Sequence, residues 1–162
     1  MIIVEFHEKE QGMVITFFGH RSLVGMEQIK KRVKNALEGY ETEGKETVFY
    51  CGGQGDFDAL CAEVCREWTK THRDSLLYLI TPYITETAQS RNEELMKAGA
   101  YDGILYPPLE KVPYRYAIVK RNEWMVREAD VIIAYVKQSY GGAYKALSYA
   151  QKMGKRVVNV AL

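Results

Sequence analysis

The sequence predicts an α/β fold: a Rossmann-like, doubly wound and mostly parallel sheet with helices on both faces. Short apolar runs with strand propensity alternate along the chain with amphipathic helical stretches. The strand runs are apolar throughout, which is typical of strands covered on both sides in a parallel sheet. The chain has 162 residues, the length of one domain, so residues 1–162 are predicted to form a single domain.

The first half of the chain predicts three strands and two helices. Residues 13–18 form a buried strand, and residues 26–37 form a helix whose basic side chains lie mostly off its apolar stripe. Residues 47–51 and 76–80 are the next two strands. The helix between them has one apolar stripe at helical spacing: Phe57, Leu60, Cys61, Val64, Cys65 and Trp68. Residues 2–7, followed by a turn at Gly12, could add an antiparallel strand at the edge of the sheet, and the sequence does not decide this.

The second half continues the alternation. Residues 84–100 predict a loop and a short helix that ends at Gly99, and residues 104–106 a short strand stopped by two prolines. Pro113 suits the first turn of a helix, which runs to about Ala129. Residues 131–136 are an apolar strand, Gly141 and Gly142 open the next helix, and residues 155–160 are the last strand.

Composition and net charge limit the kinds of partner and the location that we expect for the protein. The formal net charge is +1, which argues against a basic nucleic-acid surface and against a polybasic membrane patch, so neither partner is expected. No apolar run reaches the ~18–20 residues of a membrane span. The first eight residues lack the basic region and cleavage site of a signal peptide. Three cysteines, an odd number, favour reduced thiols, and the predicted location is the cytoplasm.

Three of the predicted strands end in glycine-rich or polar turns that lead into helices, at residues 19–21, 52–58 and 139–142. In a doubly wound sheet, ligands bind beyond the carboxyl ends of the strands, at the switch in strand order. Free N–H groups at a helix N-terminus favour anions, and glycine lets a ligand approach the backbone closely. The three turns therefore predict one ligand-binding cleft.

The second of these turns does not fit the dinucleotide fingerprint, because Asp58 stands where the third glycine would be. A carboxylate there would repel a phosphate, so ordinary NAD chemistry is not expected. Asp58 suits ribose hydroxyls or a base amine, and a merely structural role at the positive end of the helix is the alternative. Asp56 is interpreted as the cap of that helix.

Arg121 falls inside the apolar stripe of the helix after Pro113, three residues beyond Ile118. A guanidinium on an inward face must be paired or reach a ligand. We favour an anion-binding arginine, and the alternative is an arginine paired with a structural carboxylate such as Asp130.

Other reactive side chains carry less information. His20 could donate to a ligand or act as an acid or base, but no carboxylate nearby would orient it. The cysteines are interpreted as small buried hydrophobic residues, because no C-x-x-C pair exists, and no metal is predicted. Tyr140 and Tyr144 flank the last glycine turn, and either could stack on a base or simply pack.

Four motifs in order resemble the YpsA-type branch of the SLOG superfamily, which includes the DNA-processing DprA proteins and the Lonely-guy (LOG) proteins. They are FFGHR at residues 17–21, GGQGDFD at 52–58, RNEWMV at 121–126 followed by Ala129 and Asp130, and the Gly141-Gly142 pair. The resemblance implies a Rossmann-like nucleotide-binding domain. The ligand-binding residues it implies, together with the turns, are Gly19, His20, Arg21, Gly52, Gly53, Gly55, Asp58, Arg121, Asn122, Gly141 and Gly142.

Two departures bear on activity. The LOG enzymes carry P-G-G-x-G-T-x-x-E, and Ser148 stands in the place of that glutamate, which is central to hydrolysis of the N-glycosidic bond. The S-G-x-x-x-G-[IV]-D motif of DprA proteins is met only loosely, at Cys51, Gly52, Phe57 and Asp58.

The leading hypothesis is therefore a sensor or adaptor that binds a nucleotide or nucleotide-derived ligand. Phosphate would lie at Gly141, Gly142 and Arg121, with ribose at Asp58. The alternative is a nucleotide N-glycosidase that uses another base, with His20, Asp58 and Glu123 as candidates. Catalytic residues stay unknown, and a homo-oligomer is left open.

Overall fold

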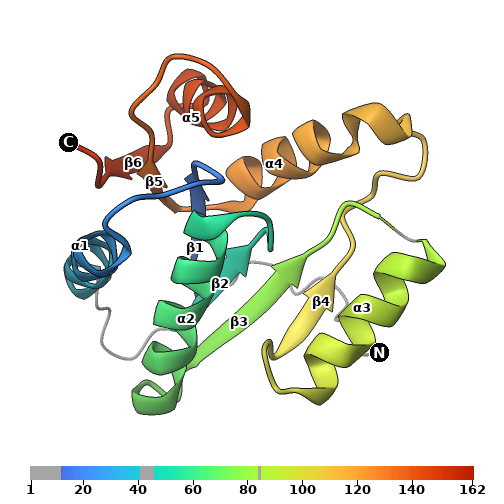
Figure 1. Ribbon diagram of the computed structural model, residues 1–162, viewed down its shortest axis with the longest axis horizontal. Helices are drawn as coiled ribbons and strands as arrows, with labels where there is room; N and C mark the ends of the chain where they lie inside the picture. Colours follow the sequence, from blue (N-terminus) through green and yellow to red (C-terminus); the bar gives the residue numbers. More distant parts are fainter. Residues whose placement is uncertain (1–11, 41–45, 84) are drawn as a thin grey trace.

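Six parallel strands form one sheet in the order β4-β3-β2-β1-β5-β6. The computed structural model describes residues 12–40, 46–83 and 85–162. This is the Rossmann-like α/β fold that the sequence predicts (Figure 1). The strands are β1 (Gly12–Gly19), β2 (Glu46–Cys51), β3 (Ser75–Ile80), β4 (Gly103–Leu105), β5 (Val131–Tyr135) and β6 (Arg156–Asn159).

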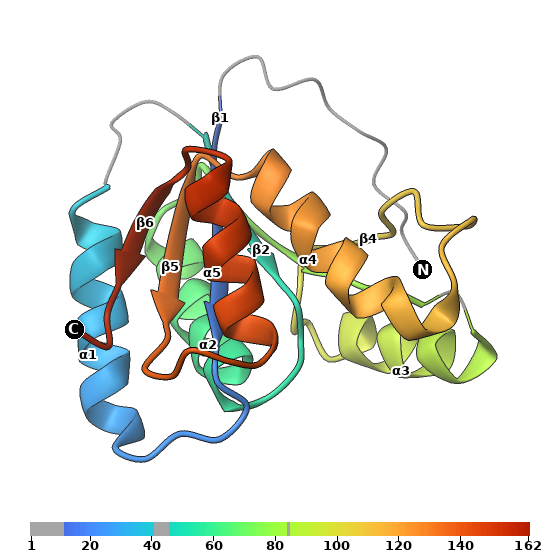
Figure 2. The same cartoon turned by 90° about the horizontal axis from the view of Figure 1, so that it is seen from above.

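Helices cover both faces of the sheet (Figure 2). They are α1 (Met26–Glu38), α2 (Asp56–Thr71), α3 (Glu86–Lys97), α4 (Ala117–Glu128) and α5 (Gly142–Lys152), with a short 3₁₀ turn η1 (Tyr114–Tyr116) before α4. Side chains alternate along β1, so that Ile15 and Phe17 pack under α1 and α2 while Val14 and Phe18 pack under α4 and α5. The apolar core therefore has two layers, one on each side of the sheet.

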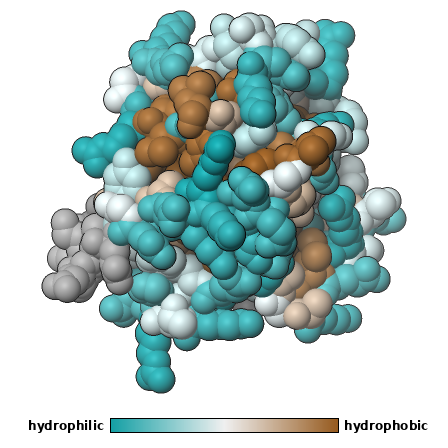
Figure 3. Space-filling view, turned by 60° about the vertical axis from the view of Figure 1, so that its left-hand side comes forward, coloured by the Kyte–Doolittle hydropathy of each residue, from teal (hydrophilic) through white to brown (hydrophobic). Residues whose placement is uncertain are grey.

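The outer surfaces of the helices are polar where the sequence pattern predicts it. Figure 3 turns the side that carries α1 toward the reader and shows a largely hydrophilic surface there, with apolar side chains gathered above it. Ile29, Val33 and Leu37 form the buried stripe of α1. Within the described ranges, no helix is long and apolar enough to cross a membrane.

The helix predicted from Pro113 begins with the 3₁₀ turn η1, in which Tyr114 is 69% exposed. The buried stripe of α4 starts one turn later, at Ala117. The edge strand left open at residues 2–7 lies outside the described residues.

The order of the strands creates a switch point beside β1. The chain runs outward from β1 through β2 and β3 to β4, and then returns to place β5 on the other side of β1. Connections leave the carboxyl ends of β1 and β5 in opposite directions, which opens a crevice between them. The loops after these strands are two of those singled out in the sequence.

Candidate ligand-binding cleft

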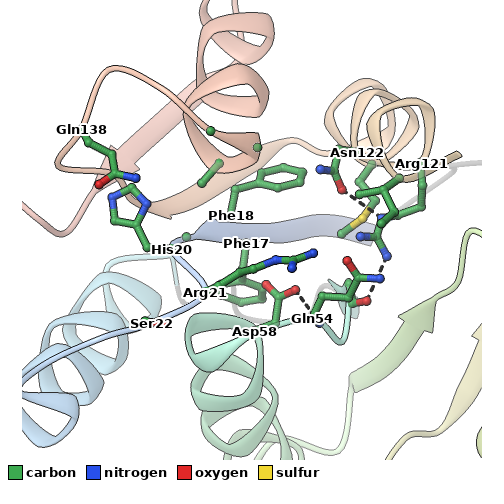
Figure 4. Close-up of a pocket in the computed structure, with 17 residues that line it drawn as sticks. Phe17, Phe18, His20, Arg21, Ser22, Gln54, Asp58, Arg121, Asn122 and Gln138 are labelled. Carbon is green, nitrogen blue, oxygen red and sulfur yellow. Dashed lines mark hydrogen bonds between the residues drawn. The ribbon is translucent and has the colours of Figure 1, made fainter. Parts of the chain in front are cut away.

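A cavity of about 550 Å³ lies at this switch point, within the size range of small-molecule sites, ~300–1,000 Å³ (Figure 4). The ends of β1 and β2, the first turn of α2, one face of α4 and the β5–α5 loop surround it. We call it the main cleft. Its lining residues are Phe17, Phe18, Gly19, His20, Arg21, Ser22, Gly52, Gln54, Asp58, Ile118, Arg121, Asn122, Met125, Gln138, Gly141, Gly142 and Ala143.

Of the predicted ligand-binding residues, all but two line the main cleft. Gly53 and Gly55 instead line a second cavity on the other side of the β2–α2 loop. Three further lining residues were not predicted: Gln54 belongs to the second turn, and Ser22 and Gln138 directly adjoin the first and third, so their closeness to the turns was the available signal. The apolar wall of the main cleft was not predicted either, because its residues follow the pattern of ordinary core positions: Phe17, Phe18, Ile118, Met125 and Ala143.

The two loops after β1 and β2 are tied together. The carboxylate of Asp56 accepts a hydrogen bond from the backbone N–H of Leu23 at 3.0 Å, and its own N–H donates to the carbonyl of Arg21 at 2.8 Å. The interpretation of Asp56 as a helix cap is therefore wrong: Gly55 occupies the cap position, and no side chain caps α2. Asp56 instead fixes the spacing of the loops that form one wall of the main cleft.

Close contacts explain two glycines at this wall. A Cβ on Gly19 would lie 2.3 Å from the ring of Phe57, and a Cβ on Gly55 would lie 2.7 Å from Cα of Arg21. Gly55 also has φ +89°, which other residues rarely adopt. Gly19 thus lets the end of β1 pack against Phe57 of α2, and Gly55 lets the β2–α2 loop approach Arg21.

Arg121 is buried, with 2% of its surface exposed, and faces the main cleft from α4. Its Nη1 donates to the carbonyls of Gly52 at 2.9 Å and Ile80 at 2.8 Å, and its Nε donates to Oδ1 of Asn122 at 2.9 Å. Within the described ranges it forms no ion pair with a carboxylate. Burial lowers the pKa of the Arg121 guanidinium, and the carboxylate of Asp58 offsets part of this decrease.

Asp130 is not the partner of Arg121. Its carboxylate accepts a hydrogen bond from the N–H of Val14 at 2.8 Å, near the amino end of β1. The alternative interpretation of Arg121 as half of an ion pair with Asp130 is therefore wrong. The protein holds the guanidinium with neutral oxygens, so its charge stays available to a ligand.

Asp58 lies in the first turn of α2 and faces the main cleft (Figure 4). Its Oδ2 accepts a hydrogen bond from the N–H of Gln54 at 2.9 Å, which orders the loop before the helix. Burial raises the pKa of Asp58 to about 6, against the opposing effects of the Gln54 N–H and of Arg121 and Arg21. The residue thus has both the structural and the cleft-facing position that the sequence left open.

His20 has a defined hydrogen-bonding role. Its Nε2 lies 2.9 Å from the backbone nitrogen of Lys137, and its ring meets Tyr135 edge-on at 5.9 Å between centroids. A backbone N–H can only donate, so Nε2 accepts, and the neutral ring carries its proton on Nδ1. In this state His20 can offer a ligand a donor but no free ring lone pair.

The N-terminus of α5 closes the far side of the main cleft. Gly141 occupies the cap position with φ +91°, and no side chain caps the helix. A Cβ on Gly142 would meet nothing within 4 Å, so the first turn is open to a ligand. Tyr140 and Tyr144, 68% and 37% exposed, are not among the residues that line the cleft.

The cysteines are the small buried residues that the sequence predicts. Cys51, Cys61 and Cys65 are free and buried in the core layer under α2, and burial raises the pKa of the Cys61 and Cys65 thiols. In the part of the chain that the structure describes, no group of three or more His, Cys, Asp or Glu residues is placed to hold a metal ion. Ser148 is half-buried on α5 and does not line the main cleft.

No family model matches the chain, and no characterised protein matches it by sequence. Its fold resembles that of the DNA processing protein A (DprA) of Helicobacter pylori, with a TM-score of 0.61, 17% identity, and coverage of 91% of this chain and 65% of that one. DprA of Streptococcus pneumoniae gives a TM-score of 0.61, 15% identity, and coverage of 91% and 52%. The chain thus shares the fold of these two DprA proteins and spans between half and two thirds of their length.

This likeness overturns the prediction against a nucleic-acid partner. The H. pylori protein, which shares the fold, binds single-stranded DNA. The net charge of +1 was a poor guide because it averages over the whole surface. The two cavities at the carboxyl ends of the strands are lined by Arg21, Arg66, Arg91 and Arg121, against one carboxylate, Asp58.

Proposed function

We propose that the main cleft binds the phosphate and sugar of a nucleotide, either free or as a unit of a single-stranded nucleic acid. The observation that carries this proposal is Arg121, a buried cation with no ion-pair partner among the described residues, held by the Gly52 and Ile80 carbonyls. A buried charge without a counter-ion is costly unless a ligand supplies one. An anionic ligand would do so.

The phosphate is assigned to the α5 side of the main cleft. The N-terminus of α2 carries Asp56 and Asp58 in its first turn, which disfavours an anion there. The first turn of α5 has no acidic residue and no side-chain cap, and its glycines permit close approach. Arg121 lines the same cleft, and Asp58 is left to accept hydrogen bonds from ribose hydroxyls.

The likeness to DprA supports a nucleotide over other phosphorylated compounds, because a protein of this fold binds single-stranded DNA. Each of the four motifs that resemble the SLOG superfamily contributes residues to the lining of the main cleft. The YpsA-type branch remains a prediction from those motifs, as does a sensor or adaptor role in the cytoplasm.

Calorimetric titration with nucleoside 5′-monophosphates, and with the matching nucleosides as controls for the phosphate, tests the proposal. The expected result is binding of a monophosphate at least tenfold tighter than its nucleoside, with loss of this difference in Arg121→Leu. Arg127→Leu is the matched control, since Arg127 lies on the same helix, is exposed and does not line the cleft. Equal binding by the two variants would refute the proposal.

Hydrolysis of a nucleotide N-glycosidic bond is the second candidate, and one observation favours it. A carboxyl group in the cleft with a pKa near 6 is suited to proton transfer at neutral pH, and Asp58 is such a group. Release of free base from a monophosphate, abolished in Asp58→Asn, would support this activity. No release from any common monophosphate would exclude it.

A further inference from the structure

Helix α3 leaves an unfilled space between itself and α2. Across Glu86–Lys97, Asn92 is the one buried residue, and α3 contributes no side chain to either core layer. The space is a second cavity of about 340 Å³, the α2–α3 cavity, on the β3 side of the β2–α2 loop. It is lined by Gly52, Gly53, Gln54, Gly55, Ala59, Ala62, Arg66, Leu79, Thr81, Pro82, Tyr83, Ala88, Arg91, Asn92, Leu95, Ala100 and Tyr101.

Asn92 is an unusual residue for such a position. It is 4% exposed, and its Nδ2 makes one long hydrogen bond, 3.4 Å, to the hydroxyl of Tyr106. Among the described residues, no donor reaches its Oδ1. A buried amide oxygen without a donor is costly, and buried polar groups are almost always satisfied. The amide faces a cavity, so a ligand placed there would satisfy it.

The remaining lining defines the chemistry of that ligand. Small and aliphatic side chains from α2, β3 and α3 form apolar walls, and Tyr83 and Tyr101 add aromatic rings. Arg66 and Arg91 stand at the cavity, and neither forms an ion pair within the described ranges. An apolar slot with aromatic rings and the side-chain amides of Asn92 and Gln54 fits a planar ring with polar edges, such as a nucleobase, with the arginines near its phosphate.

The two cavities share a wall. Gly52 and Gln54 line both, and the loop that separates them reads Gly52-Gly53-Gln54-Gly55. A Cβ on any of the three glycines would meet a neighbouring residue of the protein, so the glycines let this loop pack closely, and the loop alone separates the two cavities. We propose that the α2–α3 cavity is a second nucleobase subsite, so that the protein takes a ligand of at least two nucleotide units laid across this loop.

The inference rests on the proposed function, and the experiment separates the two. Binding of deoxyadenosine 5′-monophosphate and of its 5′-phosphorylated dinucleotide is measured by calorimetry. Stacking a second base on aromatic side chains contributes enough for about a tenfold gain in affinity for the dinucleotide. Failure of the mononucleotide and dinucleotide to bind would refute the proposed function. Equal affinity for both would refute only the second subsite.

Variants of α3 locate the second base. Asn92→Leu removes the amide, and Ala88→Leu fills the cavity from the same helix. Both should abolish the gain for the dinucleotide and leave mononucleotide affinity within twofold. Ser90→Leu is the matched control, because Ser90 is exposed on α3 and lines neither cavity. A dinucleotide gain that survives in both cavity variants overturns the assignment.

Longer deoxyadenosine oligonucleotides identify the source of the two units. Affinity that rises beyond two nucleotides and falls steeply with salt indicates a single strand. Affinity that levels off at two units indicates a free dinucleotide. Both outcomes uphold a two-unit site, whereas a maximum at one unit contradicts it.

Discussion

Nη1 of Arg121 and Oδ2 of Asp58 face the same side of Gly52: a Cβ built on this glycine would lie 3.2 Å from the first atom and 3.1 Å from the second. The missing side chain leaves the space that the two charged groups occupy. They are close neighbours, yet they form no ion pair among those found in the described ranges. The cleft thus presents a donor and an acceptor side by side.

Gly52→Ala should therefore impair both stability and binding. The guanidinium cannot move aside easily, because two carbonyls hold its Nη1. We expect a loss of roughly 1–3 kcal/mol in the free energy of unfolding, as for other overpacked sites, together with weaker nucleotide binding. Urea denaturation measures the first effect. Gly142→Ala is the stability control, since its Cβ meets nothing within 4 Å, and a loss as large there would contradict the explanation.

Arg121→Leu removes the donor to the carbonyls of Gly52 and Ile80. It breaks no ion pair, because Arg121 forms none within the described ranges. The unmet carbonyls should cost about 1–3 kcal/mol of stability, and nucleotide binding should be lost. Breaking a buried ion pair would cost more, roughly 3–5 kcal/mol. Chemical denaturation of the ligand-free variant distinguishes the two, and a loss above ~4 kcal/mol would mean that Arg121 is chiefly structural.

Asp58 should make stability depend on pH. Its pKa is raised from 3.8 to about 6 in the folded protein, so the folded state holds the proton more tightly than the unfolded chain. The free energy of unfolding should then fall by roughly 1–3 kcal/mol as pH rises from about 4 to about 6. Asp58→Asn should lack this component. Parallel stability profiles for the two proteins over this pH range would contradict the assignment.

The ring of His20 offers a direct spectroscopic test. In the neutral state its proton should reside on Nδ1, because Nε2 accepts from the N–H of Lys137. Long-range ¹H–¹⁵N correlation spectra distinguish the two tautomers of the ring. Observation of the Nε2–H tautomer would show that the β1–α1 and β5–α5 loops are not joined as described.

Most of the fold follows from local sequence patterns. The apolar run of β5 and the stripe of α2 are unambiguous because every inward position is filled by an apolar residue. The predicted cleft followed from them, since three glycine-rich turns sit at the carboxyl ends of parallel strands. The spacing of apolar residues on the helix after Pro113 likewise shows which side faces inward, so the inward position of Arg121 could be predicted.

The partners of Arg121 could not be predicted, because they are backbone carbonyls and any residue type supplies one. A carboxylate was the visible candidate, and Asp130 proved to bind the amino end of β1. The α2–α3 cavity was missed for a different reason. Helix α3 lacks an apolar stripe, so the sequence pattern could not predict which way Asn92 or Arg91 would face. The excess of arginines around the two cavities could not be predicted from the overall net charge of +1.

The most direct test of a nucleotide-binding cleft is a titration of the ¹⁵N-labelled protein with adenosine 5′-monophosphate, followed through its backbone amide signals. The predicted result is saturable shifts of Gly52 and Gln54 on one side of the main cleft and of Gly141 and Gly142 on the other, all absent in Arg121→Leu. No saturable shift, or shifts confined to residues outside the cleft, would contradict it.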